Sequence, residues 1–194
     1  RALSNQLFTI DDVFESDRGV WSSYYAHSNL NQLNPDALLD VLNSKLSALK
    51  TSIQEGTHMV FSYGTAWGYR LKSSQQLVAN CHKQPQNCFH KTLQSVEDTK
   101  KIIEKTVQLI RNINPDIEMI FTVSPIRHTK DGIVENSLSK AHLLTAVHSN
   151  NIEFKGLHYF PSYEILIDKL RDYRFYQDDM IHPSTLAVTT IWNT

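Results

Sequence analysis

The chain has few of the residues that mark a specialised scaffold. It holds two cysteines, six glycines and six prolines among 194 residues. A single pair of cysteines is too few for a disulfide framework, so the redox compartment stays open. The low glycine and proline content, together with 41% hydrophobic residues, excludes a disordered or low-complexity chain. This length suffices for one domain with a substantial buried core.

An excess of charge of either sign is also missing. Lys and Arg number 19 against 20 Asp and Glu, a net charge of −1. We therefore expect neither nucleic acid nor a membrane as partner. No apolar run approaches the roughly 18 to 20 residues that cross a bilayer, and no signal-peptide pattern follows Arg1. The lack of a visible targeting segment favours the cytoplasm, and the oligomeric state stays open.

Helical patterns recur along the chain. From Pro35 to Ile53 apolar residues return at helical spacing, Asn34 is a typical N-cap, and Gly56 is placed to end the helix. Pro183 is placed to open a last helix. Similar apolar patterns predict two further helices, at residues 95–113 and 138–147.

Strand patterns alternate with these helices. Short apolar runs at 58–63 and 117–123 are typical of buried strands. Residues 65–94 show no clear period and are expected to be irregular, with function or short hidden elements. Residues 159–167 predict an edge strand or an extended loop because they contain Pro161. The alternation predicts an α/β fold with a parallel sheet and helices on both faces.

Asp179 and His182 form the strongest candidate catalytic pair. Hydrolysis by a serine needs a base that takes the hydroxyl proton and a carboxylate that orients this base. An Asp three residues before a His, in a turn that opens a helix, places both side chains on one side and leaves one imidazole nitrogen for the substrate. The ordinary alternative is that Asp179 caps the last helix and His182 merely precedes Pro183.

Gly64 and Asn80 are candidates for an oxyanion hole. Gly64 follows the strand at 58–63, at the carboxyl edge where open α/β sheets place their ligands, and its N–H can turn towards a developing oxyanion. The amide of Asn80 can donate a second hydrogen bond. In isolation each residue also has an ordinary explanation, as a strand-ending glycine and as a loop asparagine bonded to the local backbone.

The order of these residues carries a family resemblance. A strand ending at Gly64, then Asn80, then an Asp179-x-x-His182 pair near the chain end follows the block order of the SGNH hydrolases, named for Ser, Gly, Asn and His. The surrounding strings resemble one branch of that superfamily, the bacterial GSCFA family. These strings are Tyr63-Gly-Thr-Ala-Trp67, Val78-Ala-Asn-Cys-His-Lys83, Thr122-Val-Ser-Pro-Ile-Arg127, Tyr159-Phe-Pro-Ser-Tyr-Glu164, Asp172-Tyr-Arg-Phe-Tyr176 and Asp179-Met-Ile-His-Pro-Ser184.

The resemblance implies a flavodoxin-like three-layer α/β/α fold and esterase or acyl-hydrolase chemistry without a metal or organic cofactor. It assigns Gly64 and Asn80 to the oxyanion hole, His182 to the base and Asp179 to the orienting acid. The string Gly-Ser-Cys-Phe-Ala, which names the family and contains the expected nucleophile, is absent. We therefore expect residues 1–194 to form a single SGNH hydrolase-like domain that lacks its first strand and nucleophile segment. Ser62 is a poor substitute, because strand geometry directs it away from the loop face or into the core.

Two further residues are candidates for the substrate pocket. Trp67 adjoins the oxyanion glycine. Arg127 follows the strand at 117–123 and could bind an anionic or hydroxyl-rich substrate, although a solvated loop is the alternative.

A zinc site is the weakest hypothesis. Two thiols and two imidazoles fall within a short stretch, but their order matches none of the usual paired-ligand spacings, and we expect no metal. We expect instead a buried Cys81 and an exposed His90. The residues considered for this site are Cys81, His82, Cys88 and His90.

Three functions therefore remain open. The first is an esterase that deacylates a small-molecule or carbohydrate ester through a covalent acyl-enzyme. Acyl transfer to a sugar hydroxyl uses the same constellation. A non-catalytic ligand-binding module on the same fold is the third, because a missing nucleophile is what such a module predicts. Residues 1–194 alone are expected to be nearly inactive.

Overall fold

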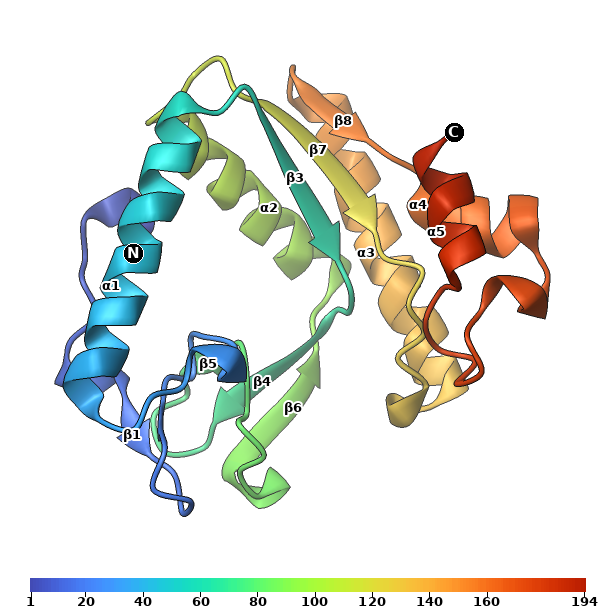
Figure 1. The fold of residues 1–194 in the computed structure, drawn as a ribbon. Helices are drawn as coiled ribbons and strands as arrows, with labels where there is room; N and C mark the ends of the chain where they lie inside the picture. Colours follow the sequence, from blue (N-terminus) through green and yellow to red (C-terminus); the bar gives the residue numbers. More distant parts are fainter. The chain divides into compact units, whose positions relative to one another are not determined.

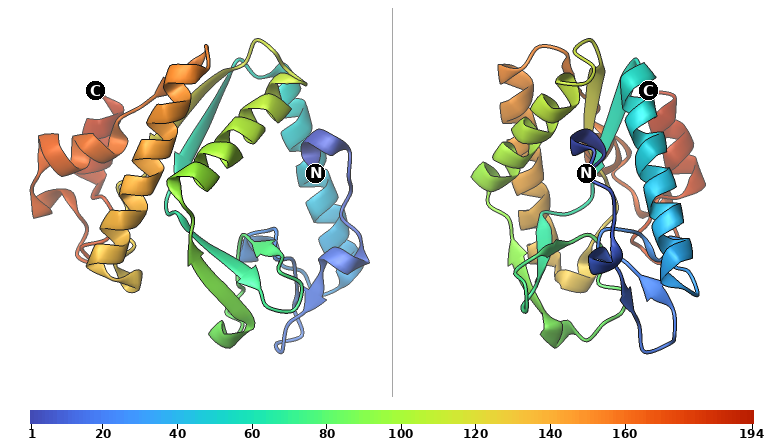
Figure 2. Two further views of the ribbon diagram at one scale, coloured as in Figure 1. Left: turned by 180° about the vertical axis from the view of Figure 1, so that it is seen from behind. Right: turned by 90° about the vertical axis from the view of Figure 1, so that its left-hand side faces the viewer.

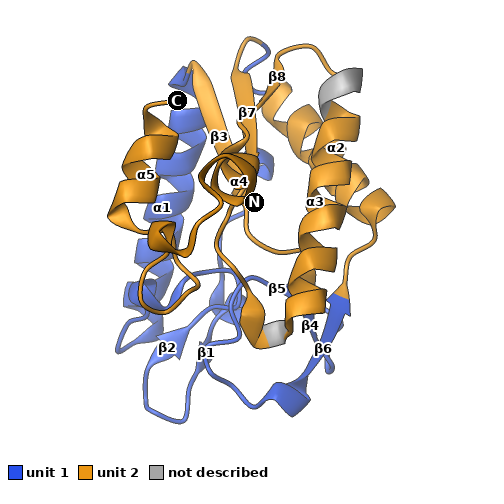
Figure 3. Ribbon diagram, turned by 90° about the vertical axis from the view of Figure 1, so that its right-hand side faces the viewer, with its two compact units in different colours: residues 1–56, 68–92, 112–115 blue, residues 57–67, 93–111, 116–194 orange. Residues whose placement is uncertain are grey.

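The computed structural model of the chain describes residues 1–130, 132–150 and 154–194. Contacts divide the chain into two compact units, drawn in different colours in Figure 3. Unit 1 comprises residues 1–56, 68–92 and 112–115, and unit 2 comprises residues 57–67, 93–111 and 116–194. Assignment of residues 1–194 to one SGNH hydrolase-like domain stays a prediction.

Unit 2 is built on a parallel sheet with the strand order β3-β7-β8 (Figure 1). β3 (His58–Tyr63) and β7 (Glu118–Val123) pair along their whole lengths, and β8 (Leu157–Tyr159) pairs with the other side of β7. Tyr63 lies opposite Val123, so both strands end at the same edge of the sheet. The two strands predicted at 58–63 and 117–123 are confirmed, but the side chains of β3 alternate between exposed and half-buried positions, so its predicted burial is wrong.

Helices cover both faces of this sheet. α2 (Val96–Arg111) and α3 (Ile133–Glu153) lie on one face, in front of the strands in the left view of Figure 2. There Val123 and Leu143 share a buried cluster. On the other face, Ser162 of the short α4 (Ser162–Glu164) contacts Thr122, whose side chain points away from that of its neighbour Val123. The prediction of an α/β fold is confirmed, and the layers are consistent with a three-layer α/β/α arrangement.

The end of unit 2 is helical. Pro161 follows β8, and the chain then enters α4 and a π-helix (Ile165–Leu170). The prediction of a strand or loop over 159–167 holds to Pro161 and is wrong from Ser162 on, because the residues after the proline form helix and bury Ile165 and Leu166 against α5 (Thr185–Trp192). Pro183 does not open α5 as predicted; it pairs with Tyr176 in an isolated bridge ahead of the helix.

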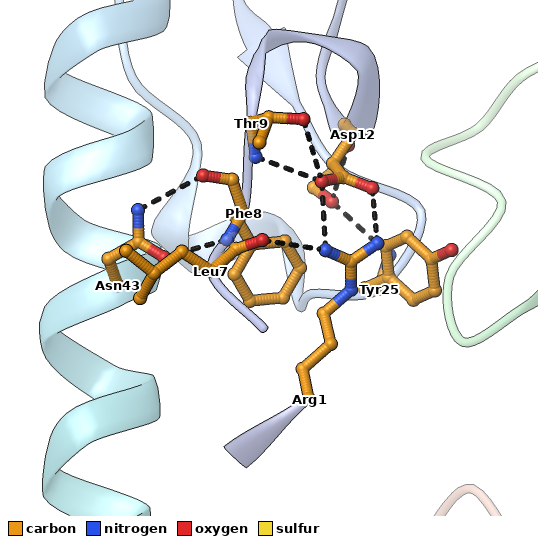
Figure 4. Close-up of polar contacts among 8 residues, drawn as sticks. Arg1, Leu7, Phe8, Thr9, Asp12, Tyr25 and Asn43 are labelled. Carbon is orange, nitrogen blue, oxygen red and sulfur yellow. Dashed lines mark hydrogen bonds and ion pairs between the residues drawn. The ribbon is translucent and has the colours of Figure 1, made fainter. Parts of the chain in front are cut away.

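Unit 1 contains α1 (Pro35–Glu55), β1 (Phe14–Glu15) and β2 (Trp21–Ser22). The predicted cap is confirmed: Asn34 Oδ1 accepts the N–H of Ala37 at 2.8 Å. Gly56 ends α1, as predicted. Figure 4 shows how α1 holds the N-terminal segment, because Asn43 accepts the N–H of Phe8 at 2.8 Å and donates to its carbonyl at 3.2 Å. Beside it the Arg1 guanidinium pairs with the Asp12 carboxylate.

Residues 65–94 contain short elements, the alternative that the sequence left open to an irregular loop. They form a three-stranded sheet in the order β5-β4-β6, with β5 antiparallel to β4. Its strands are β4 (Trp67–Leu71), β5 (Leu77–Val78) and β6 (Phe89–Leu93). The strands are only two to five residues long, too short for a periodic pattern to be detected from sequence. No helix in the described ranges is long and apolar enough to cross a membrane.

Single 3₁₀ turns complete the chain. They span Ala2–Ser4, Ile10–Asp12, Ser28–Leu30, Gln86–Cys88, Thr129–Asp131 and Tyr173–Phe175.

Candidate active site

The turn that holds Asp179 and His182 is fixed by its own backbone. Gln177 donates its N–H to the carbonyl of His182 at 2.8 Å, and Met180 donates to the carbonyl of Gln177 at 2.9 Å. Met180 takes a φ of 57°, a left-handed conformation that is uncommon for a side chain of this size. Such a conformation persists only where the surroundings enforce it, and here it folds residues 177–182 into a closed loop ahead of α5.

Inside this loop the Asp179 carboxylate faces the imidazole of His182. Oδ2 lies 2.6 Å from Nδ1, and Oδ1 accepts the backbone N–H groups of Ile181 (2.8 Å) and His182 (3.0 Å). The backbone and side-chain hydrogen bonds from His182, followed by the backbone bond from Ile181, lower the pKa of Asp179 to about 2. An ionised carboxylate can only accept, so Nδ1 carries the proton and Nε2 is left as the basic nitrogen. The cap of α5 is Ser184, not Asp179.

Nε2 of His182 has no hydrogen-bond partner among the described residues. The side chains of His182 and Asp179 are 51% and 42% exposed, so this nitrogen can meet a molecule from solvent. No serine in the described ranges bonds to the imidazole, and Ser62 lies on β3 with its side chain exposed. The arrangement can remove a proton from an incoming hydroxyl, but the described residues supply no such hydroxyl.

Arg127 joins the end of β7 to the turn of Asp179 and His182. Its N–H donates to the carbonyl of Ile181 at 3.2 Å, and its Nη1 donates to that of Met180 at 2.9 Å. Its guanidinium lies over the ring of Tyr176, 5.7 Å from the centroid. Arg127 also lines a cavity of about 280 Å³ together with the π-helix and Tyr176. An open depression of about 600 Å³ next to it is lined by Tyr176, Asp179 and Ser184, among others.

Gly64 lies at the carboxyl edge of the sheet, where the sequence places it. Its carbonyl accepts a hydrogen bond from Lys140 Nζ at 2.6 Å, and the carbonyl of Ser124, at the end of β7, accepts a second one at 2.6 Å. A Cβ at Gly64 would lie 3.2 Å from His128 Nε2, closer than most Cβ contacts, so this position is crowded.

Lys140 is the residue at this edge that sequence reasoning missed. Only 1% of it is exposed, and burial away from water lowers the pKa of its ammonium to about 8. Its spacing could have revealed it, because Lys140 falls three and seven residues before Leu143 and Val147, which face the core from the same side of α3. A lysine on the apolar face of a predicted helix is rarely buried without a polar partner.

A family model described as "GSCFA family" matches residues 1–194. The chain belongs to the GSCFA family. No curated protein and no solved structure matches it. Five of the six strings that carry the resemblance lie in unit 2 of this GSCFA protein. Two of them span the ends of β3 and β7 at the carboxyl edge of the sheet, and another is the turn of Asp179 and His182.

Two other predicted site residues of the GSCFA chain, Asn80 and Trp67, do not line the cavity at Arg127 or the depression at Asp179. Asn80 belongs to unit 1, so its pairing with Gly64 in an oxyanion hole stays a prediction. Its Oδ1 accepts the N–H of His82 at 2.9 Å, which matches the ordinary alternative of a loop asparagine bonded to nearby backbone. Trp67 opens β4 and lines neither the Arg127 cavity nor the depression at Asp179. Its role in a substrate pocket stays a prediction.

The two cysteines of the GSCFA protein are unpaired thiols. Cys81 is half-buried, so its predicted full burial is wrong, and burial raises the pKa of its thiol. Cys88 and His90 are exposed, as predicted for His90. Among the described residues no three His, Cys, Asp or Glu side chains come together in a group that could hold a metal ion.

Proposed function

We propose that this GSCFA protein hydrolyses small or carbohydrate-linked esters by the SGNH mechanism, with His182 as general base and Asp179 as its orienting acid. One observation carries the proposal. The Asp179 carboxylate is held ionised by two backbone N–H groups while it receives Nδ1–H of His182 at 2.6 Å, and the other ring nitrogen is open. This is the arrangement that a base needs in order to take a hydroxyl proton repeatedly.

The proposed reaction has two half-steps. A serine hydroxyl, expected on a segment carrying the family's namesake string, loses its proton to Nε2 of His182 as its oxygen attacks the ester carbonyl. The tetrahedral intermediate then collapses, His182 gives the proton to the departing alcohol, and an acyl-serine remains. Water, deprotonated by the same nitrogen, releases the acid and restores the serine. Gly64 and Asn80 are proposed as the donors to the oxyanion.

The Arg127 cavity is the proposed place for the part of the substrate next to the ester. Its lining brings two guanidinium groups, the Asp172 carboxylate, two tyrosines and aliphatic side chains of the π-helix together beside the turn of Asp179 and His182. Arg127 can bind a carboxylate or hydroxyl group there, and the tyrosine rings can contact a sugar.

The test is ester hydrolysis by the protein expressed from its whole gene, with acetyl and longer acyl esters as substrates. His182→Ala should lower kcat/KM by roughly 10² to 10⁴, the usual contribution of a general base. The matched control is His158→Ala, because His158 also forms an exposed pair with a carboxylate, Glu118, at 2.7 Å. That variant should keep full activity.

The products and controls separate the alternatives. Free acid as the only product supports hydrolysis, whereas acyl transfer to an added sugar supports an acyltransferase with the same residues. A protein that turns over none of the esters, or loses equal activity in both histidine variants, contradicts the proposal and favours a binding module.

A further inference from the structure

Unit 1 contains a pocket of about 580 Å³ that includes neither Asp179 nor His182, although Asn80, proposed above as an oxyanion donor, is among its lining residues. It lies between the segment at residues 16–31 and the loop at residues 80–85, and it will be called the unit-1 pocket. Its volume falls within the range of small-molecule sites, roughly 300 to 1,000 Å³. Most such sites are lined mainly by apolar groups, but here Val20 and Pro85 are the only apolar side chains among the lining residues. A ligand for this pocket must therefore be strongly polar.

His82 is held rigidly at the wall of the unit-1 pocket. His82 and Lys83 are consecutive non-glycine residues with positive φ, 49° and 58°. Each such conformation costs about 1 to 3 kcal/mol and is typical of ligand-binding segments. The ring of His82 is fixed by Nε2–H, which donates to the carbonyl of Ser23 at 2.7 Å, and by edge contacts with the rings of Phe14 and Tyr24.

Two buried polar atoms of the pocket residues have no partner. They are Nδ1 of His82 and Oγ of Ser22, neither of which has a hydrogen bond within the described ranges. A buried polar atom without a partner costs about 1 to 3 kcal/mol, so native structures rarely contain one without a reason. Both atoms are covered by protein, so a ligand in the pocket does not contact them directly; they show that the wall of the pocket is polar and under-satisfied.

The charges that line the unit-1 pocket favour an anion. Arg18 and Lys83 contribute two positive charges from opposite segments, against one carboxylate, Asp17. Asn80 adds an amide: its oxygen is used by His82 N–H, and its NH₂ group is left to donate. Guanidinium and amide donors match a carboxylate, and the hydroxyl and imidazole groups match sugar hydroxyls.

We propose that the unit-1 pocket binds a small hydroxyl-rich carboxylate, such as an acidic monosaccharide. Arg18, Lys83 and the NH₂ group of Asn80 hold the carboxylate, while the hydroxyl side chains of Ser16 and Ser28 meet the hydroxyls. The test of this proposal is separate from that of ester hydrolysis, because binding is measured without turnover. Asn80 is shared with the proposed oxyanion hole, but the residues substituted below, Arg18 and Lys83, are not.

The experiment is a titration of the ¹⁵N-labelled protein with D-glucuronate, D-glucose and inorganic phosphate, followed by NMR. Glucuronate should give saturable shifts of the His82 and Lys83 amides and bind at least tenfold more tightly than glucose or phosphate, a difference of about 1.4 kcal/mol or more. Glucose lacks the carboxylate and phosphate lacks the carbon-bound hydroxyls, so each probe lacks one of the two kinds of group that the pocket is proposed to bind.

The double variant Arg18→Gln/Lys83→Gln tests the charges. It should bind glucuronate at least tenfold more weakly with an unchanged circular dichroism spectrum. Lys72→Gln is the matched control, because Lys72 is an exposed lysine of unit 1 outside the pocket. Absence of saturable binding, equal affinity for glucose or phosphate, or equal weakening by Lys72→Gln would overturn the proposal.

Discussion

At the scale of the residue, the proposed base and an ordinary surface contact can be compared, because the protein has two exposed pairs of histidine and carboxylate. Asp179 with His182 and Glu118 with His158 have nearly the same N–O distance, 2.6 and 2.7 Å, and similar exposure. Asp179 differs because its second oxygen is fixed by two backbone N–H groups of the same turn. The imidazole of His182 therefore contacts a carboxylate that the backbone has already oriented. The attraction between two exposed charges is weak, and here it is not needed to hold the carboxylate in place.

The first prediction concerns the acidity of Asp179. An NMR titration of its carboxyl should give a pKa of about 2 in the wild type. In His182→Ala the value should rise but stay below the ordinary range, because the backbone bonds from residues 181 and 182 remain while the side-chain bond is lost. The stability due to this group is present above its ordinary pKa and is lost as pH falls towards 2. A wild-type value near that of free aspartate, about 3.9, would contradict the geometry.

The second prediction concerns Lys140, which bonds to the carbonyls at the ends of β3 and β7. Lys140→Met should lower the free energy of unfolding by about 2 kcal/mol, since two carbonyl oxygens lose a charged donor while the cost of burying the charge is relieved. The exposed Lys105→Met is the control and should have little effect.

The difference in free energy of unfolding between the wild type and Lys140→Met should also depend on pH. The folded pKa of Lys140 is about 8 and its ordinary value is 10.5, so between these values the unfolded chain binds more protons. Wild-type stability should therefore rise relative to Lys140→Met as pH increases through this range. Chemical denaturation of both proteins near pH 8 and near pH 10.5 measures this change. If the difference between their unfolding free energies is the same at both pH values, the ammonium of Lys140 is not shielded from water.

At the scale of the element, the sequence reveals what is local and periodic. The helix at 35–55 was predictable because its apolar stripe, its asparagine cap and its terminating glycine all lie within one segment. The π-helix at 165–170 was not, because its conformation depends on packing against α5 rather than on its own pattern. The Asp179 and His182 pair is equally local, three residues apart in one turn, and for that reason the sequence could suggest it.

The third prediction tests how α4 is fixed to β7. Ser162 Oγ lies 2.6 Å from Thr122 Oγ1 and donates to the carbonyl of Val123 at 2.9 Å, with both side chains buried. Ser162→Ala should cost about 1 to 3 kcal/mol of unfolding free energy, because the carbonyl of Val123 loses a donor and the hydroxyl of Thr122 loses its acceptor. In a double-mutant cycle with Thr122→Val the two losses should not add, because the residues share one contact. Additive losses would mean that the bond contributes nothing to stability.

At the scale of the whole molecule, the family match covers both units, whereas the geometry of the proposed site comes mainly from unit 2. The GSCFA match covers residues 1–194 and so includes both units. The proposed base and its acid lie in unit 2, together with Arg127 and Gly64, whereas Asn80 lies in unit 1. The sequence could suggest Gly64 and Asn80 as an oxyanion pair because the motifs follow one another in the order typical of the SGNH hydrolases. That order gives no distance between the two residues.

The fourth prediction states the central claim, that Asp179 acts on catalysis only through His182. The measurement is kcat/KM for the best ester in the protein expressed from its whole gene, for Asp179→Asn, His182→Ala and the double variant. His182→Ala and the double variant should be equally slow, with Asp179→Asn also slow, since residues that work as one unit are not additive. If the double variant loses the product of the two single losses, or if His182→Ala retains full activity, the pair of Asp179 and His182 is not the catalytic base.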